Sequence, residues 1–202
     1  MASIPRSLSV LAVVVVLAAA SACQPAHQFQ GQEVEAPAPA VLTGTNWNGE
    51  EFELGDTRGQ VAIVSFGYTY CPDVCPFTLA KMKQLYGELG PAADEVAVVF
   101  ASVDPHRDSV EKLSNYVPNF DERFYGVRMD FDQIDAAKES FGLAVQYGQP
   151  KDGPGTDSFY YVDHTGSYFV FDRAGALRVR FPPNATVAEI LPDVEYLLSE
   201  EG

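Results

Sequence analysis

The stretch FGYTYCPDVCPFTL, residues Phe66 to Leu79, joins two segments of different character and carries a cysteine pair, Cys71 and Cys75. Before it, residues 61–66 form a continuous apolar run of strand length, which is typical of a strand buried on both faces. After it, apolar residues recur at helical spacing over 77–89 until a Gly-Pro pair ends the pattern. The cysteines are therefore predicted between the carboxyl end of a strand and the start of a helix, where α/β folds place their sites.

The rest of the chain alternates between strand and helix patterns. A strand, a helix and a second buried strand in this order favour a parallel pair, which later strands extend in antiparallel fashion. We therefore expect an α/β fold with a central mixed sheet, flanked by helices and preceded by an N-terminal strand or hairpin extension. The predicted strands are 52–54, 61–66, 96–103, 158–162, 167–171 and 177–181, and the predicted helices are 77–89, 109–116, 132–141 and 186–199.

Composition and charge restrict the function classes. The chain has 202 residues, of which 47% are hydrophobic and 20% are charged, and this balance is typical of one globular domain. The formal net charge is −15, so the surface repels phosphate backbones. We therefore exclude nucleic acid as a partner.

The N-terminus predicts export. Arg6 precedes an unbroken run of Val, Leu and Ala over 10–20, which is too short to span a bilayer and suits a signal-peptide core. The following Ala-Ser-Ala-Cys23 resembles a bacterial lipobox, although the usual Leu three places before the cysteine is Ala. We expect residues 1–22 to be a lipoprotein-type signal peptide and Cys23 to carry lipid, with ordinary signal-peptidase cleavage and an uncleaved anchor as alternatives. The predicted location is the periplasmic side of a bacterial cell envelope, anchored to the membrane.

A polar segment separates this leader from the domain. Residues 23–40 are rich in Gln, Pro, Ala and Glu and carry few large apolar side chains, so we expect a flexible tether. His27 lies in it and is expected to be a solvated linker residue. Residues 41–202 form the predicted domain.

The cysteine pair is suited to thiolate chemistry. A helix start lowers the pKa of a nearby thiol. At four-residue spacing, both sulfurs of Cys71 and Cys75 can lie on the same side of the first helical turn, close enough to form a disulfide or to hold one ion. A purely structural disulfide is one alternative, although so short a loop constrains the unfolded chain little. Thiolates also attack disulfides and act as soft ligands that select Cu(I).

Ligand count separates copper from zinc. A closed zinc site needs four donors, and the predicted domain offers Cys71, Cys75, His106 and His164. His106 is expected to be exposed. The two cysteines and His164 make a three-donor set, which suits Cu(I) and leaves an open position for transfer; zinc is disfavoured.

Three sequence blocks occur in order: FGYTxCPDVCP at 66–76, SVDPxRD at 102–108 and VDHT at 162–165. With these blocks the chain resembles the Sco/SenC family of copper-binding proteins with a thioredoxin-like fold, over about residues 46–199. The resemblance implies that Cys71, Cys75 and His164 coordinate copper, as Cu(I), Cu(II) or both. It also implies that Asp104 lies behind these ligands or acts as a weak axial one.

The position of His164 has separate support. Residues 169–178 look like the hairpin strand of thioredoxin-like proteins, and the loop before that strand faces the active-site cysteines. That loop usually carries a cis-proline, whereas here it carries His164 and no proline lies between Pro154 and Pro182.

The resemblance implies a copper metallochaperone that delivers copper to the dinuclear copper site of cytochrome c oxidase or assists its assembly. Its partners would be the copper-bearing oxidase subunit and other copper chaperones. One alternative is a thiol–disulfide oxidoreductase that uses Cys71 and Cys75 as a redox pair to reduce the copper-ligand cysteines of the target. A redox sensor or thiol peroxidase is another. Thiol exchange does not need His164, whereas copper carriage does, so we expect primarily a metal carrier.

Overall fold

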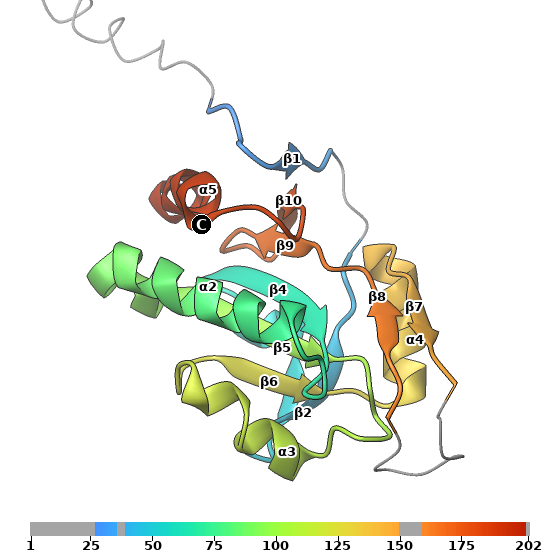
Figure 1. Ribbon diagram of the computed structural model, residues 1–202. Helices are drawn as coiled ribbons and strands as arrows, with labels where there is room; N and C mark the ends of the chain where they lie inside the picture. Colours follow the sequence, from blue (N-terminus) through green and yellow to red (C-terminus); the bar gives the residue numbers. More distant parts are fainter. Residues whose placement is uncertain (1–26, 36–38, 150–158, 201–202) are drawn as a thin grey trace, which may run out of the picture.

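The computed structural model describes residues 27–35, 39–149 and 159–200 (Figure 1). The predicted signal peptide and Cys23 lie outside these residues. Within them, no helix is both long enough and apolar enough to cross a bilayer.

The centre of the fold is a group of parallel strands in an eight-stranded sheet. Strands β4 (Val61–Gly67) and β5 (Val96–Ser102) are buried at every position and pair in parallel along their whole length. Strand β6 (Tyr125–Arg128) continues the parallel group beside β5. Because the strands run in parallel, the carboxyl ends of β4 and β5 meet at one edge, directly before the cysteine segment and before Asp104.

Antiparallel strands extend this group on both sides. The sheet order is β1-β10-β9-β4-β5-β6-β2-β3, with β9 antiparallel to β4 and β2 antiparallel to β6. Strands β2 and β3 form the expected N-terminal hairpin. The bounds of these strands are β1 Gln32–Glu33, β2 Thr43–Asn46, β3 Glu51–Glu53, β9 Tyr168–Phe171 and β10 Leu177–Phe181.

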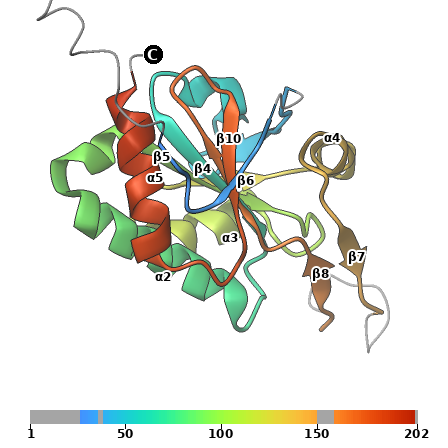
Figure 2. The same ribbon diagram turned by 90° about the horizontal axis from the view of Figure 1, so that it is seen from above.

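Helices cover both faces of the sheet (Figure 2). Helices α2 (Val74–Leu89) and α5 (Val187–Ser199) pack against each other on one face, and α4 (Phe131–Phe141) lies on the other. Helix α2 ends where Gly90 adopts a positive φ of 58° and its N–H bonds to the Tyr86 carbonyl. Short helical segments complete the fold, namely α3 Val110–Ser114, η1 Leu54–Thr57, η2 Gly90–Glu95 and η3 Val117–Asn119.

Two predicted elements need correction, and some short strands, β6 among them, were missed. Strand β6 was not predicted, because its four residues (YGVR) give too short a pattern. The predicted strand at 158–162 is wrong, since the strand is β8 (Val162–His164), which pairs with β7 (Val145–Tyr147) in a separate two-stranded sheet. The helix predicted at 109–116 is limited to α3, because the chain passes into a 3₁₀ turn after Tyr116.

The prediction of a flexible tether is wrong for residues 27–35, which we call the N-terminal strap. Strand β1 of the strap pairs with β10, and the buried Asp193 of α5 accepts hydrogen bonds from the backbone N–H groups of Gln30 and Gly31 at 2.9–3.0 Å. His27, expected to be solvated, lies 3.0 Å from the same carboxylate through Nε2 and stacks on Tyr196. The strap is ordered because the domain supplies an acceptor and a strand edge that its own sequence lacks.

Candidate metal centre

The two cysteines occupy different environments at the junction of β4 and α2. Cys71 lies in the connecting loop and is partly exposed, whereas Cys75 is the second residue of α2 and is 2% exposed. Gly67, the last residue of β4, makes this packing possible. A Cβ at Gly67 would lie 2.8 Å from the sulfur of Cys75 and 2.5 Å from the Phe100 ring, so any side chain there would displace Cys75.

Strand β8 brings the predicted histidine to the cysteines. His164 is the last residue of β8, and its Nε2 lies 4.0 Å from Cys75 Sγ. Its Nδ1 lies 3.1 Å from the Thr165 carbonyl, which can only accept, so Nδ1 carries the proton. The lone pair of Nε2 is therefore on the side of the sulfur, and this orientation is the one that a metal-binding imidazole requires.

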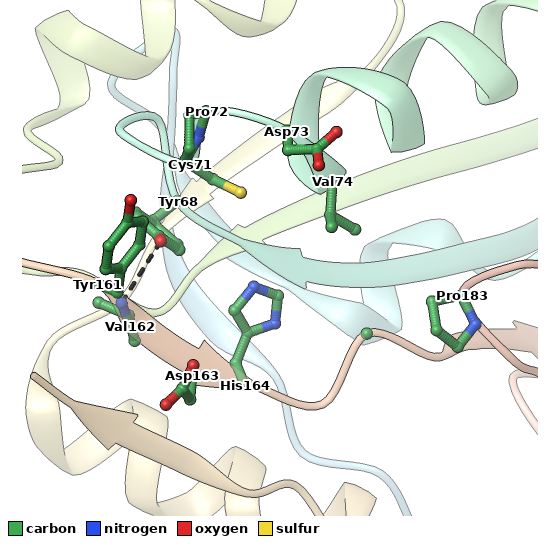
Figure 3. A pocket seen from close by; sticks show the side chains of 11 residues that line it. Tyr68, Cys71, Pro72, Asp73, Val74, Tyr161, Val162, Asp163, His164 and Pro183 are labelled. Carbon is green, nitrogen blue, oxygen red and sulfur yellow. Dashed lines mark hydrogen bonds between the residues drawn. The ribbon is translucent and has the colours of Figure 1, made fainter.

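A cavity of about 510 Å³ opens between the cysteine loop and β8. Cys71 and His164 both line it, and Figure 3 shows the Cys71 sulfur and the His164 ring directed into the same space. Tyr68 also lines it, and its hydroxyl accepts from the Val162 N–H at 3.4 Å, which joins the loop to β8. The residues that line the cavity come from the cysteine loop, from the segment around β8 and from Pro183 after β10.

The two thiols share one proton unequally. The Cys75 thiol donates a hydrogen bond to Cys71 and holds the Cys71 pKa at about 5, helped by the backbone N–H groups of Asp73, Val74 and Cys75 and opposed by burial. The same hydrogen bond, together with burial, raises the pKa of Cys75. The two cysteines are not joined to each other in this structure, so the predicted disulfide is not formed here. Cys71 is thus a partly exposed thiolate backed by a buried thiol.

The three candidate donors are present but are not yet arranged around one metal position. Among the described residues, no group of three His, Cys, Asp or Glu side chains is already arranged to hold a metal ion. Cys75 is the shared neighbour, because it donates a hydrogen bond to Cys71 and lies 4.0 Å from His164 Nε2, so a three-coordinate site needs the three donors to close around one ion. His106, the fourth zinc donor considered above, is exposed and packs on the Phe131 ring at 5.0 Å. Two thiols and one imidazole match the preference of Cu(I).

Asp104 lies outside the cavity and supports the segment that carries His164. It is fully buried, pairs with Arg107 at 2.5 Å and accepts from the Tyr160 hydroxyl at 2.6 Å. Arg107 in turn donates to the Tyr160 carbonyl at 2.9 Å. The pair therefore holds the segment that leads into β8 and His164, and Asp104 does not line the cavity.

A second buried carboxylate holds the cysteine loop, and the sequence did not reveal it. Asp108 accepts from the backbone N–H and hydroxyl of Thr69 at 2.9 and 2.5 Å and from the Ser102 hydroxyl at 2.6 Å. Burial raises its pKa. The contact with Thr69 exists because β4 and β5 end side by side, which no local pattern around Asp108 shows.

Comparisons with known proteins identify relatives of this chain. The model of the SCO1/SenC family matches residues 37–199. The chain is 37% identical over 122 residues to the human mitochondrial protein SCO2 homolog, covering 59% of this chain and 44% of that protein, so it spans less than half the length of that relative.

Two solved structures share the fold. Apo Sco1 from Thermus thermophilus is 33% identical and superposes with a TM-score of 0.75, covering 86% of this chain and 99% of that one. Bradyrhizobium japonicum ScoI with copper bound is 30% identical with a TM-score of 0.68, covering 79% and 98%. These likenesses confirm the predicted α/β, thioredoxin-like fold with a mixed sheet flanked by helices.

Proposed function

The chain belongs to the SCO1/SenC family, and we propose that it is a copper metallochaperone that binds copper through Cys71, Cys75 and His164. Its target is the dinuclear copper site of cytochrome c oxidase, to which it delivers copper or whose assembly it assists. The copper-bound relative from Bradyrhizobium supports the cargo, and the family resemblance supports the target.

The observation that carries the proposal is the approach of His164 Nε2 to Cys75 Sγ at 4.0 Å. A protein that only exchanges thiols needs no imidazole beside its buried sulfur. Two soft thiol donors beside an imidazole with a free lone pair form a donor set that suits copper.

Copper is the cargo, so the site must release it as well as hold it. Three donors leave Cu(I) with an open position, and the cavity between Cys71 and His164 gives access to it. Cys71, partly exposed and already a thiolate, is the donor through which an incoming ligand exchanges most readily. Cys75 and His164 retain the ion until the partner's ligands replace them.

We also propose that the domain is tethered to the membrane by lipid at Cys23, on the periplasmic side of the cell envelope. The basis is the sequence alone: a short apolar run followed by small residues and a cysteine.

A second candidate function is thiol–disulfide reduction, and the unequal thiols favour it. The Cys71 thiolate attacks one sulfur of a target disulfide, and the other target sulfur leaves as a thiolate. Cys75 then passes its proton to the released target thiolate and attacks Cys71 Sγ, which releases the second target sulfur as a thiolate that takes a proton from water. The Cys71–Cys75 disulfide forms, the target becomes a dithiol and two electrons are transferred.

The variant His164→Ala separates the two functions, with His106→Ala as the matched control because His106 is exposed and does not line the cavity. We expect His164→Ala to lose copper retention by orders of magnitude and to fail in an oxidase copper-loading assay, while it still forms the Cys71–Cys75 disulfide and reduces a model disulfide. His106→Ala should behave like the wild type in both assays. Normal copper loading by His164→Ala would leave reduction as the main function.

A further inference from the structure

Most of the exposed large apolar side chains in the described part of the chain lie in one region of the molecule. Seven are exposed among the described residues, and five of them come from two short segments on either side of the candidate metal centre. We call these five the aromatic rim: Tyr70, Val74, Phe77, Phe159 and Tyr161, which are 37–68% exposed. The two outside the rim are Val41 and Phe131. Clustered exposed apolar side chains mark interaction sites, whereas scattered ones need no explanation.

The rim borders the opening of the cavity at two points and extends away from it. Val74 and Tyr161 line the cavity from opposite sides, and Figure 3 shows them with Cys71 and His164 between them. The ring of Phe159 packs edge-on against Tyr161 at 5.0 Å and continues the apolar surface beyond β8. Phe77 extends it in the other direction, into a hollow between α2 and the start of α5. A partner that covered the rim would therefore enclose the metal donors.

The surface around the cavity opening carries negative charge. Asp73 and Asp163 are exposed, line the cavity and have no ion pair in the described part of the chain, and no lysine or arginine lines it. Two lysines lie beside the rim, where Lys112 stacks on Tyr70 and Lys81 donates to the Pro183 carbonyl. With a net charge of −15 over the whole chain, the surface attracts a cationic face.

We propose that the aromatic rim, with Asp73 and Asp163, is the docking surface for a protein that carries its own copper-ligand cysteines in an apolar surface bordered by Lys or Arg. The inference rests on the proposed function and names the chemistry of the partner at the same site. Docking places the partner's thiols against Cys71 and excludes water from the transfer. Aromatic side chains at the centre of an interface carry a large share of its binding free energy, and the acidic side chains steer the encounter.

The test measures copper transfer from the Cu(I)-loaded protein to the apo, dithiol form of the soluble copper-binding domain of the oxidase subunit from the same organism. Val74→Ser is compared with Val41→Ser, because both valines are 46% exposed and only Val74 belongs to the rim. Asp163→Lys is compared with Glu139→Lys, an exposed acidic position on α4. Each rate is divided by the rate of transfer to a small Cu(I) chelator, which needs no docking, so that any effect on the copper ligands cancels.

We expect this ratio to fall about tenfold for Val74→Ser and for Asp163→Lys, and by less than about twofold for the two controls. The wild-type ratio should also fall as salt rises, and Asp163→Lys should weaken that dependence. An unchanged ratio in Val74→Ser would overturn the proposal. So would a wild-type dimer in analytical ultracentrifugation that Val74→Ser abolishes, because the rim would then bind a second copy of this chain.

A separate measurement keeps the two proposals apart. Isothermal titration of the copper-free protein with the same apo domain reports docking without transfer. If the wild type transfers no copper yet binds the domain through the rim, the chaperone function fails and the docking surface stands. If copper is transferred and Val74→Ser binds as tightly as the wild type, the docking surface fails and the chaperone function stands.

Discussion

Cys75 Sγ lies 4.0 Å from His164 Nε2, although 89 positions separate the two residues in the sequence. The contact joins the start of α2 to the end of β8, and β8 belongs to a separate two-stranded sheet, outside the main one. Its geometry therefore depends on whatever holds that small sheet against the domain. The Tyr68 hydroxyl binds the small sheet by accepting a hydrogen bond from the Val162 N–H. The buried pair of Asp104 and Arg107 binds the segment just before the sheet, at Tyr160.

Replacing Asp104 should show this dependence. Asp104→Asn leaves the buried Arg107 guanidinium without its carboxylate, and breaking a buried ion pair costs about 3–5 kcal/mol of unfolding free energy. Urea unfolding of the copper-free protein measures the loss. The milder Tyr160→Phe removes only the hydroxyl bond to Asp104 and should cost about 1–2 kcal/mol. Equal stability of Asp104→Asn and the wild type would mean that the pair does not support this segment.

The unequal thiols give a pH dependence with a defined sign. The pKa of Cys71 is lowered to about 5, so Cys71 is a thiolate at every pH above that value and loses its charge only as the pH falls through it. Alkylation by iodoacetamide, which requires the thiolate, should reach half its maximal rate near pH 5 in the native, reduced protein. In Cys75→Ala the main hydrogen-bond donor is gone, so the midpoint should move upward. A native midpoint near the ordinary value of 9.0 would contradict the thiol–thiolate pairing.

The N-terminal strap should depend on Asp193. Asp193→Ala removes the acceptor for two backbone N–H groups and for His27, so we expect the strap to detach at a cost of about 1–3 kcal/mol. Limited proteolysis should then cut within residues 27–35 much faster than in the wild type. His27→Ala removes one of the three bonds and should have a smaller effect. Equal cleavage of Asp193→Ala and the wild type would show that strand pairing alone holds the strap.

The lipid anchor predicts a specific mature N-terminus. Intact-mass analysis of the membrane fraction should find a chain that begins at a lipidated Cys23. A species that still carries residues 1–22 would instead indicate an uncleaved anchor, and an unmodified chain in the soluble fraction would indicate ordinary signal-peptidase cleavage.

The sequence revealed those features that depend on local pattern. The strands β4 and β5 follow from continuous apolar runs, and α2 follows from helical spacing ended by Gly90. The placement of the cysteines at the strand–helix junction follows from both. His164 was predicted beside them because it precedes the hairpin strand β9, and the 4.0 Å contact confirms that position.

What the sequence missed depends on contacts between distant residues. Asp193 is 163 positions from Gln30, and neither residue carries a local signal that the strap will dock. The contact between Asp108 and Thr69 could not be predicted, because it forms only when β4 and β5 pair and their ends lie side by side. Phe159 and Tyr161 resemble a strand because they are aromatic, yet β8 forms only from Val162 onward, where β7 supplies backbone partners. The exposure of these two rings was therefore not predictable.

X-ray absorption at the copper edge of the Cu(I)-loaded protein tests the central claim most directly, because it counts the atoms bound to the metal. For the wild type we expect one copper ion per chain, coordinated by two sulfurs and one imidazole nitrogen. The same measurement on His164→Ala should lose the imidazole scattering and keep both sulfurs, with weakened retention. A copper site bound only by sulfur in the wild type, or identical spectra for the wild type and His164→Ala, would contradict the assignment of Cys71, Cys75 and His164 as the copper ligands.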